Sequence, residues 1–225
     1  MIIPLWHIDR ITMSSSADIL QQFLADFKNS QLDSIQQQAD SGDRVACRQL
    51  GSLYANGRGV KFNHDEAQKW LTLAADQGDI AAMTLLGWIL VNQGSGRVNG
   101  HLLAMEWYQK AAEAGDADAQ CALADLYISG APGIEPNGEA MLYWYEKAAF
   151  QHHPKAQYQL GKMLSDGRLI PQHNELAFHW LTFAILNGSE AAQKEMAMLT
   201  ARLDRSELEQ FRQRMMQQYQ SMLTH

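Results

Sequence analysis

Residues 42–78 read GDRVACRQLGSLYANGRGVKFNHDEAQKWLTLAADQG, and the same small set of residues returns along most of the chain. The successive copies open at Gly42, Gly78, Gly115, His152 and Gly188, in steps of 36, 37, 37 and 36 residues. A period of roughly 20 to 50 residues is typical of solenoids, in which each unit buries its apolar face against its neighbours. We therefore interpret the chain as a series of repeats.

The recurring slots hold residue types that suit the packing of two helices. An alanine stands four residues after each opening residue, at Ala46, Ala82, Ala119, Ala156 and Ala192. A tryptophan stands late in each of four units, at Trp70, Trp107, Trp144 and Trp180. Small residues let helices approach closely, and large ones fill the space between them. Four of the six tryptophans are therefore predicted to belong to the repeat core.

A glycine-bearing turn separates the two halves of each unit. These turns lie at residues 57–60, 94–96, 130–134 and 166–170. Glycine ends a helix by adopting the left-handed conformation that other residues resist. With only five prolines and no alternating Val/Ile runs, the chain is predicted to be all-α, each unit running helix, glycine turn, helix, closing glycine.

The pattern A-x3-LG-x2-Y-x2-G-x-GV, then A-x2-W-x3-AA-x2-G, resembles that of the Sel-one-like repeat (SLR) family, relatives of the tetratricopeptide repeats. Residues 42–78 carry it whole, and residues 79–188 carry it with substitutions. The departures are Leu90 and Leu164 at the tyrosine slot, Met141 at the alanine slot, His152 at the closing glycine and Leu169 at the second turn glycine. The resemblance implies an α/α superhelix, a right-handed solenoid of antiparallel helix pairs.

We expect three regions along the chain. Residues 1–41 form an N-terminal segment with capping helices over 17–27 and 32–40. Four repeats follow at 42–78, 79–115, 116–152 and 153–188, and residues 189–225 hold a partial repeat and a C-terminal capping helix. Ser206 and Glu209 have capping-box spacing at the start of that last helix, before an apolar stripe at Leu208, Phe211, Met215, Tyr219 and Met222. A solenoid needs such a cap for solubility, although the helix could instead be offered to a partner.

Charge and composition disfavour several classes of partner. The 225 residues carry a net charge of −7 with no basic stripe, so nucleic-acid binding is not expected. Asp9 and Arg10 interrupt the apolar start of the chain, so we expect no export signal and no membrane insertion. Cys47 and Cys121 lie two repeats apart, roughly 20 Å or more, which predicts free thiols and a cytoplasmic location.

No pattern of catalytic or metal-binding residues stands out. The chain has no Ser-x-x-Lys and no Gly-x-Ser-x-Gly. His152, His153 and His179 lack a Cys or carboxylate at metal-ligand spacing, and we interpret the histidines as surface residues. We therefore predict a non-enzyme without cofactor or metal. Two alternatives stay open: a β-lactam or cell-wall hydrolase, as attributed to cysteine-rich relatives, and a structural protein that self-assembles weakly through its terminal helices.

By resemblance to tetratricopeptide solenoids, the concave face is lined by first-helix positions three, six, ten and thirteen residues after each opening residue. These positions vary while the core slots recur, so they can encode a partner. The candidate binding residues are Arg48, Thr84, Trp88, Asp118, Asp125, Lys155, Tyr158 and Lys162. Trp88 stands where the other repeats have Ser52, Asp125 and Lys162, so we expect a partly exposed aromatic anchor; the alternative is that it tucks against a neighbouring helix.

The charged candidates allow two interpretations. Asp118 and Asp125 in the third repeat face Lys155 and Lys162 in the fourth, and these charges either neutralise each other or select the direction of a bound peptide. In the second case Lys155, Tyr158 and Lys162 would hold an acidic segment or a C-terminal carboxylate. The sequence thus predicts a bacterial scaffold or adaptor that binds a protein segment in its concave groove.

Overall fold

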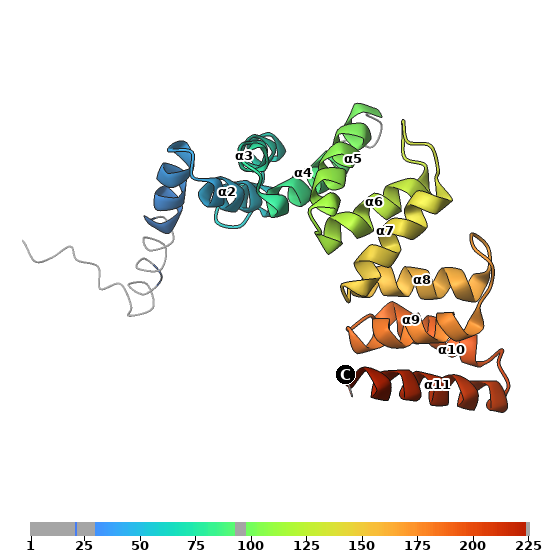
Figure 1. The fold of residues 1–225 in the computed structure, drawn as a ribbon. Coiled ribbons are helices and arrows are strands. Elements are labelled where there is room, and N and C mark those ends of the chain that lie inside the picture. The colour runs from blue at the N-terminus through green and yellow to red at the C-terminus, as the bar shows by residue number, and fades with distance from the viewer. Residues whose placement is uncertain (1–20, 22–29, 93–97, 224–225) are drawn as a thin grey trace, which may run out of the picture. The chain divides into compact units, whose positions relative to one another are not determined.

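The computed structural model describes residues 21, 30–92 and 98–223, and within them every regular element is a helix (Figure 1). The all-α fold predicted from the repeat is thereby confirmed. Residues 30–40 are helical, whereas the capping helix predicted over 17–27 and the glycine turn at 94–96 fall outside the described residues, apart from residue 21. The chain forms two compact units, residues 1–79 and 80–225.

Helix pairs follow the repeat register in both units. The first unit contains α2 (Arg44–Asn56) and α3 (His64–Asp76), which pack together. The second unit contains α4 (Ile80–Asn92), α5 (Val98–Glu113), α6 (Ala117–Ser129), α7 (Gly138–Phe150), α8 (Pro154–Asp166), α9 (Asn174–Leu186), α10 (Glu190–Thr200) and α11 (Arg205–Leu223). There α4 packs on α5, α6 on α7 and α8 on α9, while α5 contacts α6, α7 contacts α8 and α10 contacts both α8 and α9.

The first helix of each repeat ends at the predicted turn glycine wherever that glycine is described. Gly57, Gly130 and Gly167 cap α2, α6 and α8 with φ of 63°, 58° and 67°, in the left-handed region. The residue after each opening slot begins the next helix: the carboxylate of Asp43 accepts from Ala46 N at 2.7 Å. Asp116 accepts from Ala119 N at the same distance. The glycines and aspartates at the turns therefore determine where these helices end and begin.

The core of each repeat lies where a small residue of the first helix meets a large one of the second. A Cβ on Gly51 would lie 2.6 Å from Leu71 Cγ, and a Cβ on Gly161 would lie 2.7 Å from Leu181 Cγ. The residue directly after each tryptophan is deeply buried in all four repeats: Leu71, Tyr108, Tyr145 and Leu181. The tryptophans themselves differ, since Trp70 and Trp144 are buried but Trp107 and Trp180 are only half-buried. All four therefore fill the repeat slot, but Trp107 and Trp180 are less deeply buried in it than Trp70 and Trp144.

Buried glutamines tie successive repeats of the second unit together. Gln120 Nε2 donates to Ala112 O at 3.0 Å, and Gln157 Nε2 donates to Ala149 O at the same distance. Each amide thus adds a second donor to a carbonyl near the end of the preceding second helix, since Ala112 O already accepts from Gly115 N and Ala149 O from His152 N. In the first unit Cys47 occupies the same slot, and its thiol donates to Ala39 O at 3.5 Å.

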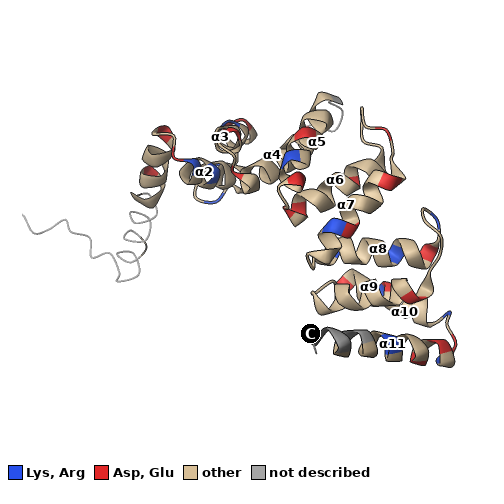
Figure 2. Ribbon diagram, in the orientation of Figure 1, with Lys and Arg blue, Asp and Glu red and all other residues tan. Residues whose placement is uncertain are grey.

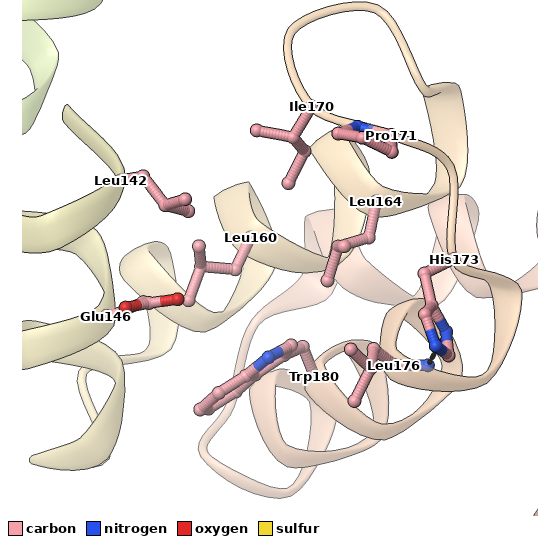
Figure 3. A pocket seen from close by; sticks show the side chains of 9 residues that line it. All are labelled: Leu142, Glu146, Leu160, Leu164, Ile170, Pro171, His173, Leu176 and Trp180. Atoms are coloured by element: carbon pink, nitrogen blue, oxygen red, sulfur yellow. Dashed lines mark hydrogen bonds between the residues drawn. The ribbon is translucent and has the colours of Figure 1, made fainter. Parts of the chain in front are cut away.

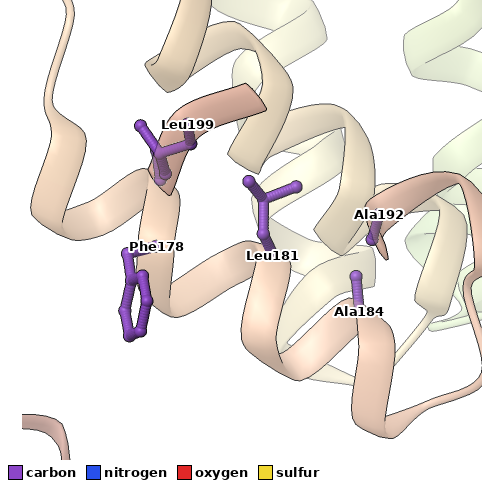
Figure 4. Close-up of a cluster of buried hydrophobic side chains, with 6 residues drawn as sticks. Phe178, Leu181, Ala184, Ala192 and Leu199 are labelled. Atoms are coloured by element: carbon purple, nitrogen blue, oxygen red, sulfur yellow. The ribbon is translucent and has the colours of Figure 1, made fainter. Parts of the chain in front are cut away.

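The C-terminal helices cover the last repeat. Phe178, Leu181 and Ala184 of α9 form a buried cluster with Ala192 and Leu199 of α10 (Figure 4). From α11, the side chains of Leu208, Phe211 and Met215 pack against this cluster, as the apolar stripe predicted; Tyr219 and Met222 are outside the described side chains.

The start of α11 corrects the predicted capping box. Glu207 N donates to Asp204 Oδ1 at 2.8 Å, and Asp204 N donates to Glu207 Oε2 at 3.0 Å. The box is therefore Asp204 with Glu207, two residues before the predicted Ser206 and Glu209, because an aspartate carboxylate caps a helix as well as a serine hydroxyl does.

Candidate partner-binding site

Trp88 on α4 is partly open to solvent. Its exposed fraction is 49%, whereas that of the core residue Trp70 is 5%. The indole of Trp70 also donates to Glu66 Oε2 at 3.0 Å, while within the described part of the chain the Trp88 side chain has no such bond. The first helix therefore presents a large aromatic surface at a position that the fold does not need to fill.

Asp125 and Lys155, both predicted as binding residues, pair with each other. Lys155 Nζ donates to Asp125 Oδ2, across from α8 to α6, and Tyr145 of α7 donates its hydroxyl to Asp125 Oδ1. Burial lowers the pKa of Lys155, but the hydrogen bond to Asp125 and its charge outweigh this and raise the pKa above its ordinary value. Burial and the Asp125 carboxylate likewise raise the pKa of Tyr145. The interpretation that these charges neutralise each other is correct for this pair.

Asp118 also has a partner, one that the sequence reasoning missed. His153 Nδ1 accepts from Ala156 N at 3.2 Å and thereby caps α8. A neutral ring that accepts at Nδ1 carries its proton on Nε2, so it donates to Asp118 Oδ1, 3.0 Å away. The repeat pattern could have predicted this helix cap, because His153 stands in the slot where other repeats have Asp43 and Asp116.

Arg48 and Thr84 occupy the same slot in successive repeats and make the same kind of contact. Arg48 Nε lies 3.1 Å from Asp79 Oδ2 in the first unit. Thr84 Oγ1 donates to Asp116 Oδ1 at 3.0 Å in the second unit. Each reaches the aspartate one residue after the next opening slot, so both residues join neighbouring repeats.

Lys162 on α8 lines a pocket of about 300 Å³. Tyr158, on the same helix, packs instead against the buried cluster that contains Phe178 and Leu181. The ammonium of Lys162 lies 6.0 Å from the centre of the Tyr158 ring. The pocket is lined by Ile128, Lys162, Met163, Asp166, Arg168 and Leu169, among others. Neither Lys162 nor Arg168 forms an ion pair with another described residue. Arg168 was not predicted as a binding residue, because it lies in the turn after Gly167 and outside the first-helix positions from which the candidates were chosen.

The described residues hold no group of three or more side chains suited to binding a metal ion. Lys and Arg are scattered among Asp and Glu along the helices in Figure 2. Both cysteines are free, as the sequence predicted, and both are buried. None of the helices in the described ranges combines the length and the apolar character that a membrane span requires.

Comparison with known proteins identifies the repeat. Residues 44–79, 80–116, 117–152 and 154–189 match the model of the Sel1 repeat, with boundaries at most two residues later than predicted. A protective antigen of uropathogenic Escherichia coli with an SLR fold is 29% identical with a TM-score of 0.74, covering 80% of this chain and 38% of the antigen. A Sel1 repeat protein from Oxalobacter formigenes is 28% identical with a TM-score of 0.69, covering 83% and 78%.

This chain thus spans well under half of the antigen's length. No curated protein gave a significant match. The four matched repeats nevertheless account for well over half of the residues, and the paired helices agree with the solved SLR structures. The chain therefore belongs to the Sel1 repeat family.

Proposed function

We propose that this protein is a non-enzymatic scaffold whose first-helix surface, formed by α4, α6 and α8, binds a segment of a partner protein with Trp88 as the anchor. Sel1 repeat proteins generally mediate protein–protein interactions. The observation that carries the proposal is the 49% exposure of Trp88 in a slot where other repeats hold Ser52, Asp125 or Lys162. Aromatic side chains of this kind dominate the energy of protein interfaces.

The same surface favours an acidic partner segment. Lys162 and Arg168 line the pocket of about 300 Å³ on α8 and lack ion-pair partners among the described residues, while Lys155 is occupied by Asp125. Against the single carboxylate of Asp166, the two cations leave the pocket with a positive balance, which suits an acidic side chain or a C-terminal carboxylate next to an apolar one. We assign the anion contact to Lys162 and Arg168 in place of Lys155.

The buried free thiols favour a reducing compartment, and we place the protein in the bacterial cytoplasm. The alternative function, hydrolysis of a β-lactam or of cell wall, is attributed to relatives whose helices are bridged by cysteines. Cys47 and Cys121 here form no such bridge, so that alternative has no support from this chain.

The test compares Trp88→Ala with Tyr143→Ala, because Tyr143 on the second helix α7 has a matching exposure of 50%. Purified wild type and both variants are used to capture partners from lysate, and the affinity for each recovered protein is then measured. Removal of an aromatic anchor typically costs about 2 kcal/mol, or roughly 30-fold in affinity. Trp88→Ala should show this loss with unchanged helicity and melting. Equal binding by wild type and Trp88→Ala, or an equal loss in Tyr143→Ala, would refute the proposal.

A further inference from the structure

The tyrosine slot of the fourth repeat holds a smaller residue. Repeats one and three have Tyr54 and Tyr127 in this slot, and the fourth repeat has Leu164. Beside Leu164 lies a pocket of about 290 Å³, between α7, α8 and α9 (Figure 3). This volume is at the lower end of the range for small-molecule sites, roughly 300 to 1,000 Å³. It suits one or two side chains of a protein partner better than a cofactor.

The wall of the pocket is almost wholly apolar. Leu142 comes from α7, Leu160 and Leu164 from α8, and Leu176 and Trp180 from α9, all around the same space in Figure 3. Leu176 is 42% exposed, although a leucine at this position could have been buried against the helices. The pocket therefore offers apolar surface that the fold leaves open to solvent.

One aromatic side chain extends this surface beyond the pocket. Phe150, at the end of α7, is 71% exposed and meets the ring of Trp180 edge-on, with centroids 5.4 Å apart. The ring centroid of Trp180 also lies 6.2 Å from that of Phe183. Contiguous exposed apolar surface of this kind marks interaction sites more often than isolated exposed residues do.

A single carboxylate borders the pocket without a partner. Glu146 on α7 is exposed and makes no hydrogen bond or ion pair with the described residues. Its neighbour Lys147 does not neutralise it, since the ammonium of Lys147 lies over the ring of Tyr143 at 4.9 Å. The other polar lining residue, His173, already accepts from Leu176 N at 3.3 Å and caps α9. Glu146 is therefore the one lining group with a free charge.

We infer that this pocket is a second docking site, separate from the Trp88 surface, and that it takes a basic segment of a partner protein. One apolar side chain of that segment fills the space beside Leu164, and a neighbouring Lys or Arg pairs with Glu146. A segment that covered the Glu146 carboxylate without supplying a cation would remove its hydration and form no compensating ion pair. Apolar or acidic segments are therefore disfavoured. The net charge of −7 also favours the approach of a basic segment.

The test starts from a random 12-residue peptide library displayed on phage and selected on the full chain. We expect one group of recovered peptides to carry Leu, Met or Phe next to Lys or Arg, and we measure a labelled synthetic copy from this group by fluorescence anisotropy. Leu164→Tyr restores the repeat's own residue and fills the pocket, so it should weaken binding at least tenfold. Glu146→Gln should weaken it about fivefold, less than a buried charged contact would, because the pair stays partly hydrated.

Controls separate this site from the Trp88 surface. Glu139→Gln removes a carboxylate from the first turn of the same helix and should leave peptide binding unchanged, as should Trp88→Ala. If Leu164→Tyr perturbs the circular dichroism spectrum, Leu176→Arg replaces it, since that change places a repelling cation on an exposed residue. Absence of basic peptides from the selection, full affinity of the basic peptide for the pocket variants, or loss of its binding in Trp88→Ala would each overturn the inference.

Discussion

His152 holds a backbone conformation that its side chain opposes, and replacement by glycine should stabilise the protein. Its φ is 64°, the only positive φ of a non-glycine residue within the described ranges. The four equivalent closing positions are all glycines, with φ of 88°, 81°, 97° and 89° at Gly42, Gly78, Gly115 and Gly188. The turn that closes the third repeat keeps its shape because His152 N still donates to Ala149 O at 3.0 Å.

The size of the gain follows from two opposing terms. The left-handed conformation costs an L-residue roughly 1–2 kcal/mol, which His152→Gly removes. Glycine also gives the unfolded chain more freedom, which returns roughly 0.4–1 kcal/mol of that gain. The exposed imidazole makes no hydrogen bond with another described residue, so its loss adds little. We expect a net stabilisation of about 0.5–1 kcal/mol, which raises the melting temperature by roughly 1–4 °C in a chain of this size.

Urea unfolding and thermal melting followed by circular dichroism measure the effect. Gly188→Ala is the matched control, because its φ is 89° and no atom lies within 4 Å of the added Cβ. It should destabilise by about 0.5–1 kcal/mol, because the same two backbone terms act with reversed sign. His152→Ala should stay near wild type, since alanine keeps the strain. If His152→Ala stabilises as much as His152→Gly, the gain comes from losing the imidazole and the reasoning fails.

Three further predictions concern the core and its buried groups. Gly161→Ala should destabilise by roughly 1–3 kcal/mol in urea despite the better helix propensity of alanine, because the new Cβ would lie 2.7 Å from Leu181 Cγ; a more stable variant would contradict this. Burial raises the pKa of Cys121 to about 12 and also raises the pKa of Cys47, so neither thiol should react with Ellman's reagent at pH 8 until urea unfolds the chain. Burial lowers the pKa of His179, so the unfolded state binds a proton first on acidification. Unfolding free energy should therefore fall as pH drops below about 6.5, and His179→Leu should flatten this slope; an unchanged slope would refute the assignment.

The repeat period alone was enough to predict the helix pairs, because each slot restricts its residue by an elementary requirement. Gly57 must adopt a positive φ, and Gly51 must admit Leu71 at close range. The deep burial of Leu71 and Tyr145 was missed because the tryptophan before each is the more conspicuous residue. A readable signal was present: the slot after each tryptophan holds only Leu or Tyr.

The side-chain pairs between repeats could not be predicted with the same certainty. Asp125 and Lys155 are 30 residues apart, and their contact depends on how far α8 shifts and turns against α6. The sequence therefore allowed both paired and free charges. His153 was overlooked for another reason, since a histidine is an uncommon helix cap and its partner Asp118 lies 35 residues away.

These contacts change what variation along the repeat means. Variable first-helix slots were expected to encode a partner, yet Arg48, Thr84 and Lys155 each use theirs to reach a neighbouring repeat. A joint between two helices needs only a matching pair, so many residue combinations satisfy it and the slot varies without any ligand. Binding to a partner protein is a stronger explanation where an exposed aromatic or charged side chain has no such pairing within the fold. By that criterion Trp88 and Lys162 form the core of the candidate site, because the packing of the described repeats does not account for either residue.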